Sequence, residues 1–305
     1  HGSTVGLNTL LEKKGADLGL ITTRGFRDVY EIARQWQGVR LFHLLEPKRE
    51  MYLSRANIFE VKERVNHSGD ILEGIDEKEI LERVKTLVAR GVKAIAVVFL
   101  FSFINPTNEK KVKEIIQDRY PDIYVSLSSE VNPEWREYER TCTAIANAYI
   151  GPKVKTYMES FEKNLKEVYP QAMPLIMQSN GGVGTPAMLS KIPITTILSG
   201  PVAGVIGTKY LGDLIGIENL ISFDVGGTSS DMSLLPGRIL FQSETQIGLQ
   251  VIRTNSVDVQ TIGAGGGSIA RVEYGSVIKV GPQSAGADPG PACYGKGGTD
   301  PTLTD

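Results

Sequence analysis

The sequence predicts an α/β fold in which mixed sheets are flanked by helices. Two observations carry this prediction. Between residues 17 and 128, apolar runs rich in β-branched residues alternate with segments of helical periodicity, an order typical of parallel strands joined by helices. From about residue 196 onward, short strand-like runs are separated by turns rich in glycine. The 305 residues suffice for two domains, which we predict at residues 1–130 and 131–305.

The spacing of apolar residues predicts the N-terminal elements. Residues 5–14 are expected to form a helix, and residues 17–22 a strand. Residues 76–90 carry apolar residues at helical spacing, with Asp76 as the N-cap. The continuously apolar run 93–101 is typical of a strand covered on both faces.

The following segments continue this alternation. Residues 105–120 begin with Asn-Pro and predict a helix with proline in its first turn, and residues 122–128 predict the next strand. Residues 133–168 are expected to be mostly helical, broken into two pieces at Gly151-Pro152. Residues 199–216 predict a helix with small residues along one face, which indicates the close approach of another element.

Composition excludes several classes of function. The net charge of −2 gives no basis for binding nucleic acid or an anionic membrane surface. No run approaches the ~18 apolar residues of a membrane helix, so no membrane segment is predicted. The two cysteines, Cys142 and Cys293, are far apart in sequence and fit a reducing cytoplasm. We therefore predict a cytoplasmic protein.

Residues 219–235 are predicted to form an antiparallel hairpin with an unusually polar tip. The tip offers backbone N–H groups at two glycines, followed by three hydroxyl groups: Gly226, Gly227, Thr228, Ser229 and Ser230. Such a group of donors is suited to phosphate oxygens. Asp224, at the end of the first strand, is placed to hold a hydrated Mg²⁺. The alternative is an ordinary polar turn, because Asp and Gly are common in turns.

A second glycine-rich stretch, TIGAGGGSIA at residues 261–270, lies between two further strand-like runs. Its small residues permit the close backbone approach that a base and ribose require: Gly263, Gly265, Gly266, Gly267 and Ser268. The spacing is not that of a dinucleotide-binding fingerprint, and a strand-like run follows it. The alternative is a flexible loop or a bulge.

These motifs, in this order, resemble the actin, sugar-kinase and heat-shock chaperone ATPase superfamily. More closely, the chain resembles the A subunit of the hydantoinase, oxoprolinase and acetone carboxylase family. The matching stretches are HGSTVGLNTLLEKKGADLGLITTRGFRDV, EVNPEWREYERTCTAIANAYIGP, MQSNGG, SGPVAGVIG, FDVGGTSSD, TIGAGGGSIA and VGPQSAGADPGPACYGKGGTDPTLTD. The resemblance implies an actin-like ATPase (ribonuclease H-like) fold. Relatives begin with a further phosphate-binding turn of the form DVGGTFTD, so it also implies a chain truncated at both ends, with an incomplete first lobe.

The resemblance further implies ATP and Mg²⁺ as cofactors and a carbonyl compound as substrate. The leading hypothesis is an ATP-dependent hydrolase subunit that phosphorylates the amide oxygen of a cyclic amide, of hydantoin or 5-oxoproline type, and opens the ring. One alternative is the ATP-binding subunit of an acetone- or acetophenone-type carboxylase, and another is a non-catalytic, structural actin-fold subunit. A hydantoinase B-type partner and a hetero-oligomer are expected, and this fragment alone is expected to be inactive.

Site roles follow from the resemblance for the matching residues. Asp224 and Asp231 are the candidate catalytic residues. Asp224 is expected to hold the metal ion, and the alternative role of Asp231 is to brace the hairpin. The hairpin tip is assigned to the phosphates and residues 263–268 to adenosine. Two further features carry alternatives: the turn at 179–182 is either a site or a structural turn, and the charged segment 134–140 is expected to be a solvated, ion-paired helix face.

Overall fold

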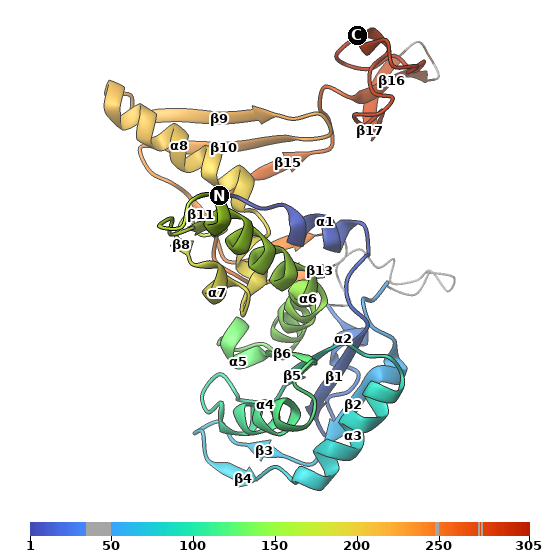
Figure 1. The fold of residues 1–305 in the computed structure, drawn as a ribbon, viewed down its shortest axis with the longest axis vertical. Helices are drawn as coiled ribbons and strands as arrows, with labels where there is room; N and C mark the ends of the chain where they lie inside the picture. Colours follow the sequence, from blue (N-terminus) through green and yellow to red (C-terminus); the bar gives the residue numbers. More distant parts are fainter. Residues whose placement is uncertain (35–49, 248–249, 274, 276) are drawn as a thin grey trace. The chain divides into compact units, whose positions relative to one another are not determined.

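The computed structural model describes residues 1–34, 50–247, 250–273, 275 and 277–305 (Figure 1). These residues form two compact units. Unit 1 comprises His1–Ser199 and Ser243–Ser256, and unit 2 comprises Gly200–Gln242 and Val257–Asp305. This division does not coincide with the boundary near residue 130, because a helix that follows that residue packs on the sheet that precedes it. The boundary between sequence domains stays a prediction.

A four-stranded parallel sheet forms the centre of unit 1. Its strands are β1 (Leu18–Thr23), β2 (Ile58–Val61), β5 (Ala94–Val98) and β6 (Tyr124–Leu127), in the order β2-β1-β5-β6. Every residue of β1 and β5 is buried, as expected for central strands of a sheet covered on both faces. The predicted α/β architecture with parallel pairing is confirmed.

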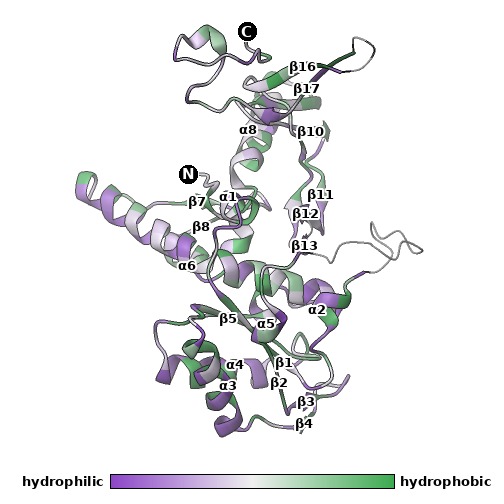
Figure 2. Ribbon diagram, turned by 90° about the vertical axis from the view of Figure 1, so that its right-hand side faces the viewer, coloured by the Kyte–Doolittle hydropathy of each residue, from purple (hydrophilic) through white to green (hydrophobic). Residues whose placement is uncertain are grey.

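Helices α3 (Glu77–Ala89) and α4 (Thr107–Arg119) cover one face of this sheet. Asp76 caps α3 as predicted, because its Oδ1 accepts the Lys78 N–H at 2.9 Å. Apolar residues of both helices, including Val84 and Ile116, pack with Ile95 of β5 in one buried cluster. Charged residues of α3, among them Glu82 and Lys85, are exposed instead, and Figure 2 shows hydrophilic residues along this helix.

The other face of the sheet is covered by α6 (Glu137–Val168), a continuous helix of 32 residues. The predicted break at Gly151-Pro152 is therefore wrong. A Cβ atom at Gly151 would lie 2.3 Å from the Tyr124 ring, so glycine lets α6 run close to β6. The buried side of the helix continues past Pro152 to Val154 and Met158, and this tertiary packing outweighs the missing N–H of one proline.

The remaining elements of unit 1 are short. The helices are α1 (Val5–Leu11), α2 (Val29–Ile32), η1 (Arg55–Asn57), α5 (Ser128–Val131), α7 (Pro186–Leu189) and η2 (Pro193–Thr196). The strands are β3 (Arg64–Val65), β4 (Ile71–Glu73), β7 (Ile176–Met177), β8 (Val183–Gly184), β12 (Thr245–Ile247) and β13 (Gln250–Ile252). Among the described residues, no helix is long and apolar enough to cross a lipid bilayer.

Unit 2 is built on an antiparallel sheet in the order β15-β10-β9. Strands β9 (Asn219–Val225) and β10 (Ser230–Pro236) form the predicted hairpin, and β15 (Gln260–Ile262) pairs with β10. The predicted helix at residues 199–216 is confirmed as α8 (Ser199–Ile215). The other short elements are β11 (Phe241–Gln242), β14 (Ser256–Val257), β16 (Ser268–Glu273), β17 (Val277–Ser284) and η3 (Ala292–Tyr294).

The two faces of the β9–β10 hairpin differ in their surroundings. On one face, α8 packs closely, since a Cβ at Gly212 would lie 2.3 Å from Leu220 Cδ1. Along the opposite face, alternate residues of β9 and β10 form a row of exposed apolar side chains. Its members are Ile221 (69% exposed), Phe223 (60%), Val225 (50%) and Leu234 (60%). Within the described residues, no atom would lie within 4 Å of a Cβ at Gly204 or Gly207 of α8, so the close approach expected there is not seen.

Candidate functional site

The tip of the β9–β10 hairpin comprises residues 226–229, beyond the last pair of Val225 and Ser230. Asp224 lies directly opposite Asp231 across the two strands. The Asp231 carboxylate accepts a hydrogen bond from the Thr261 hydroxyl of β15. The Asp224 carboxylate is exposed and has no hydrogen-bond partner in the described part of the chain. Like charges directly opposite one another repel, so this end of the hairpin favours the binding of a cation.

The donors at the tip divide into two groups. The Gly226 N–H donates to Ser229 O at 2.9 Å, and the Ser230 hydroxyl donates to Ala264 O at 2.6 Å. By contrast, the N–H groups of residues 227–229 have no acceptor among the described residues. The hydroxyls of Thr228 and Ser229 also have no hydrogen-bond partner among these residues. The structure thus leaves residues 227–229 open to an anion and uses Gly226 and Ser230 to hold the tip together.

The loop at residues 263–268 lies directly against this tip. The Gly266 N–H donates to Gly226 O at 2.9 Å, and the Gly267 N–H donates to Gly227 O at 2.7 Å. A Cβ at Gly265 would lie 2.6 Å from Gly226 O, a distance that real Cβ contacts do not show. In the structure, the close contact that these glycines permit is made by the backbone of the hairpin tip. The assignment of adenosine to the loop stays a prediction.

A third segment, residues 302–305, completes this backbone cluster and was not singled out from the sequence. Thr304 donates to Gly266 O from both its N–H (2.9 Å) and its hydroxyl (2.7 Å). The Asp305 carboxylate accepts the Cys293 N–H at 2.7 Å and two donors of Thr302. These hydrogen bonds hold the pKa of Asp305 well below its usual range. The signal in the sequence was the close spacing of two threonines and an aspartate in PTLTD.

The turn at residues 179–182 is held by bonds within unit 1. The Ser179 hydroxyl accepts the Leu198 N–H at 3.1 Å, and Asn180 Oδ1 accepts the Gly182 N–H at 2.8 Å. Gly181 has φ +83°, a backbone conformation that favours glycine. These contacts fit a structural turn, and a site role for it stays a prediction.

The charged segment 134–140 is less exposed than predicted. The face was expected to be solvated, but Arg140 is 1% exposed. Its Nη2 donates to Phe99 O and to the hydroxyls of Ser102 and Ser128. The reason is that Arg140 lies on the side of α6 that packs on β5, so the guanidinium meets the carboxyl ends of β5 and β6.

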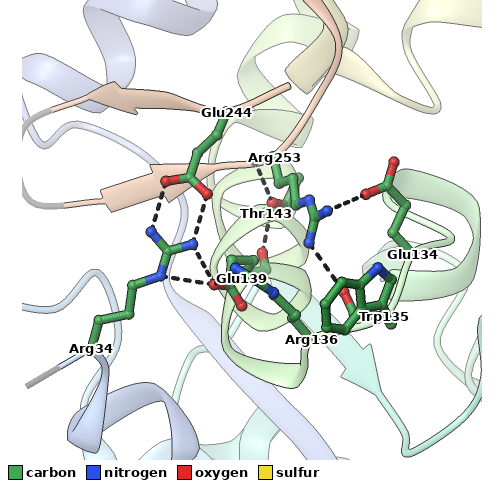
Figure 3. Close-up of polar contacts among 8 residues, drawn as sticks. All are labelled: Arg34, Glu134, Trp135, Arg136, Glu139, Thr143, Glu244 and Arg253. Carbon is green, nitrogen blue, oxygen red and sulfur yellow. Dashed lines mark hydrogen bonds and ion pairs between the residues drawn. The ribbon is translucent and has the colours of Figure 1, made fainter. Parts of the chain in front are cut away.

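Glu139 belongs to a second cluster, which joins α6 to residues 243–256 (Figure 3). Arg34 lies between Glu139 and Glu244, donating to Glu139 Oε1 at 2.8 Å and to both oxygens of Glu244 at 2.7 Å. The Arg253 guanidinium pairs with Glu134 at 2.8 Å, and the backbone N–H of Arg253 donates to the Thr143 hydroxyl. The hydrogen bonds from Arg34 lower the pKa of Glu244. Because these charges are paired with one another, we interpret the cluster as structural.

Metal binding by side chains alone is not indicated. Across the residues that the structure describes, no group of three or more His, Cys, Asp and Glu residues could hold a metal ion. A cation beside Asp224 would therefore need further oxygen ligands, such as water or phosphate, which is the arrangement that Mg²⁺ prefers.

Taken together, these observations define an α/β protein with a hairpin tip whose backbone N–H groups at residues 227–229 have no acceptor among the described residues, beside the exposed carboxylate of Asp224. Comparison with known families identifies it further. Residues 140–305 match the family described as Hydantoinase/oxoprolinase, and residues 1–120 match its N-terminal region. The chain belongs to the hydantoinase/oxoprolinase family.

The matches to individual relatives cover the whole of this chain. It is 35% identical to caprolactamase subunit alpha of Pseudomonas jessenii, covering 100% of this chain and 44% of the relative. It is also 35% identical to the acetophenone carboxylase gamma subunit of Aromatoleum aromaticum, covering 100% of this chain and 43% of the relative. The crystal structure of ATP-dependent caprolactamase from Pseudomonas jessenii superimposes with a TM-score of 0.82 at 34% identity, over 99% of this chain and 44% of that one. The chain thus spans less than half the length of these relatives.

Proposed function

We propose that this chain is the nucleotide-binding part of a larger enzyme subunit with the actin-like ATPase fold. The observation that carries the proposal is the tip of the β9–β10 hairpin, with its three consecutive N–H groups and two hydroxyls open to an anion. Backbone donors of this kind are suited to phosphate oxygens. The solved caprolactamase is described as ATP-dependent, and this description supports ATP as the nucleotide.

Mg²⁺ fits the same tip. Asp224 and Asp231 lie opposite one another, and a divalent cation would offset their mutual repulsion. Mg²⁺ is held in proteins by one or two carboxylates together with water and phosphate oxygens. We propose that Asp224 contacts the hydrated ion and that Asp231, braced by Thr261, supports it. When bound, the ion neutralises charge on the transferred phosphoryl group.

The proposed reaction is phosphorylation of the carbonyl oxygen of a cyclic amide, of hydantoin or 5-oxoproline type, followed by ring opening with water. An amide carbonyl is a poor electrophile, and transfer of the γ-phosphoryl group of ATP to its oxygen, with release of ADP, would activate the ring carbon toward addition of water. The ring C–N bond would then break with the nitrogen leaving as an amine, and a second water would hydrolyse the resulting acyl phosphate to a carboxylate and phosphate. The residues of the hairpin tip would position the phosphates and stabilise their charge. Support comes from caprolactamase, since caprolactam is itself a cyclic amide.

A carboxylase reaction is the second candidate, because the acetophenone carboxylase gamma subunit is as similar to this chain as the caprolactamase subunit. Both reactions would consume ATP but would differ in the acceptor. Release of ADP in the presence of hydantoin, 5-oxoproline or caprolactam would favour the hydrolase, whereas release that requires a ketone and bicarbonate would favour the carboxylase.

A partner subunit is part of the proposal. Both relatives are named as subunits, which supports a hetero-oligomer containing a hydantoinase B-type chain, in the cytoplasm. Functional tests therefore use the full-length protein together with its partner.

The decisive test is substitution of Asp224. Asp224→Ala is expected to weaken binding of Mg²⁺–ATP by about 10- to 100-fold, as losses at other metal sites do, in calorimetric titrations of the full complex. Asp118→Ala is a matched control, because Asp118 is an exposed residue of α4 in unit 1. If both variants bind Mg²⁺–ATP as tightly as the original protein, Asp224 does not hold the ion.

A further inference from the structure

The segment at residues 302–305 reaches the proposed nucleotide site through the glycine-rich loop. We propose that Thr304 is a positioning residue that fixes the phosphate-binding tip by way of Gly266. This inference rests on the proposed function, since it concerns the same site. Thr304 itself is not expected to touch the nucleotide.

The path from Thr304 to the tip has two steps. Thr304 holds the carbonyl oxygen of Gly266 with two donors, its N–H at 2.9 Å and its hydroxyl at 2.7 Å. Gly266 in turn donates its N–H to Gly226 O at 2.9 Å. Gly226 immediately precedes residues 227–229, whose N–H groups are the proposed phosphate donors. A displacement of Gly266 would therefore be passed to these donors.

The contact between Thr304 and Gly266 is also steric. A Cβ at Gly266 would lie 2.7 Å from the Thr304 hydroxyl oxygen, so only glycine allows the hydroxyl to approach the loop this closely. Gly266 is held on both sides, and its neighbours add one bond on each side, because Gly267 donates to Gly227 O at 2.7 Å and Leu303 donates to Ser268 O at 3.0 Å. The loop cannot shift without breaking one of these sets of bonds.

Thr304 is held in place by its own neighbours. Its N–H also lies 3.3 Å from the Thr302 hydroxyl oxygen. The Thr302 hydroxyl donates to Asp305 Oδ2 at 2.9 Å, and Asp305 accepts the backbone N–H groups of Ala292 and Cys293. The threonine is thus presented by a braced turn, and this rigidity is what a positioning residue requires.

A structural role and a positioning role predict different results. Thr304 is exposed, and its N–H would still bond to Gly266 O after loss of the hydroxyl. A purely structural role therefore predicts a small change in stability and an unchanged affinity for nucleotide. A positioning role predicts a change in nucleotide affinity that stability does not explain.

The test compares Thr304→Val, Thr304→Ser and Thr86→Val in the full-length complex. Thr86→Val is the matched control because the Thr86 hydroxyl also donates to a backbone carbonyl, Glu82 O at 2.9 Å, on an exposed part of α3. Affinity for Mg²⁺–ATP is measured by calorimetry, KM for ATP and for the carbonyl substrate by steady-state kinetics, and stability by thermal unfolding.

Thr304→Val is expected to weaken nucleotide binding about 3- to 10-fold, the equivalent of one hydrogen bond. KM for ATP should rise while KM for the carbonyl substrate does not, Thr304→Ser should bind as the original protein does, and all three variants should unfold at similar temperatures. The proposal is overturned if Thr304→Val binds nucleotide normally, or if Thr304→Ser loses as much affinity as Thr304→Val. If the original protein binds no nucleotide, it is the proposed function itself that fails, and this inference falls with it.

Discussion

At the scale of single residues, the glycines of the 263–268 loop are specified by backbone contact. Gly265 and Gly267 lie against the hairpin tip, and the space that a Cβ would need is occupied by Gly226 O and Gly227 O at 2.6 and 2.9 Å. The sequence pattern indicated residues small enough to permit a close approach. It could not indicate that part of the approach is made by the protein's own backbone, because the register between two distant turns is decided only in the folded chain.

The first residue-scale prediction concerns Gly265. Gly265→Ala should lower the free energy of unfolding by about 1–3 kcal/mol, the cost of forcing extra atoms into a packed site. Gly204→Ala is the matched control, and both variants are made in the protein of residues 1–305. No described atom would lie within 4 Å of its new Cβ in α8, so it should stabilise by about 0.5–1 kcal/mol. Urea denaturation of both variants measures the difference. Equal effects of the two substitutions would contradict the contact at Gly265.

A second prediction at this scale concerns the pH dependence of stability. Glu63 is 2% exposed and accepts hydrogen bonds from Thr23 and Asn108. Burial raises the pKa of its carboxyl above the usual value of 4.5. The folded state therefore binds this proton more tightly than the unfolded state, and the resulting stability is present below pH 4.5 and lost as the pH rises through the folded pKa.

Glu63→Gln removes this titration. The variant should gain stability relative to the original protein as the pH rises from 4.5 to 7.5, measured by urea denaturation at several pH values. Glu82→Gln serves as the control, because Glu82 is exposed on α3. A difference that stays constant with pH would show that Glu63 titrates normally.

At the scale of elements, α6 depends on long-range packing and on ion pairs. Its N-terminal half lies on the parallel sheet, and this burial carries the helix through Pro152. Local rules at Gly151-Pro152 predicted a break because they include neither Tyr124 nor the sheet. The same helix supplies Glu139 to the cluster around Arg34, which links segments more than one hundred residues apart.

The prediction at this scale concerns Arg34. Arg34→Met should lower the free energy of unfolding by about 3–5 kcal/mol, because Glu139, whose side chain is 5% exposed, would lose its close partner inside the protein. Arg55→Met is the matched control. Arg55 pairs with Asp28 and Glu31 at the surface, where such pairs contribute about 0–1 kcal/mol. Similar losses in denaturant titrations of the two variants would contradict a structural role for the Arg34 cluster.

At the scale of the whole chain, the periodicity of apolar residues predicted the elements that depend on local sequence. Three of the parallel strands of unit 1, β1, β5 and β6, follow from runs of adjacent residues, as do the cap at Asp76 and the β9–β10 hairpin, and the structure confirms them. The fourth strand, β2, was not predicted. The roles of Arg34, Thr304 and Asp305 could not be predicted in this way. Most of their partners lie far away in sequence or are backbone atoms, which the spacing of apolar residues does not reveal.

The exposed apolar row on the hairpin should affect the solubility of residues 1–305 when they are purified alone. The row from Ile221 to Val225, with Leu234 beside it, exposes half or more of each apolar side chain to solvent. Surfaces of this kind invite self-association. Purification of residues 1–305 alone should therefore require dilute samples and mild detergent. The segment should precipitate as its concentration rises.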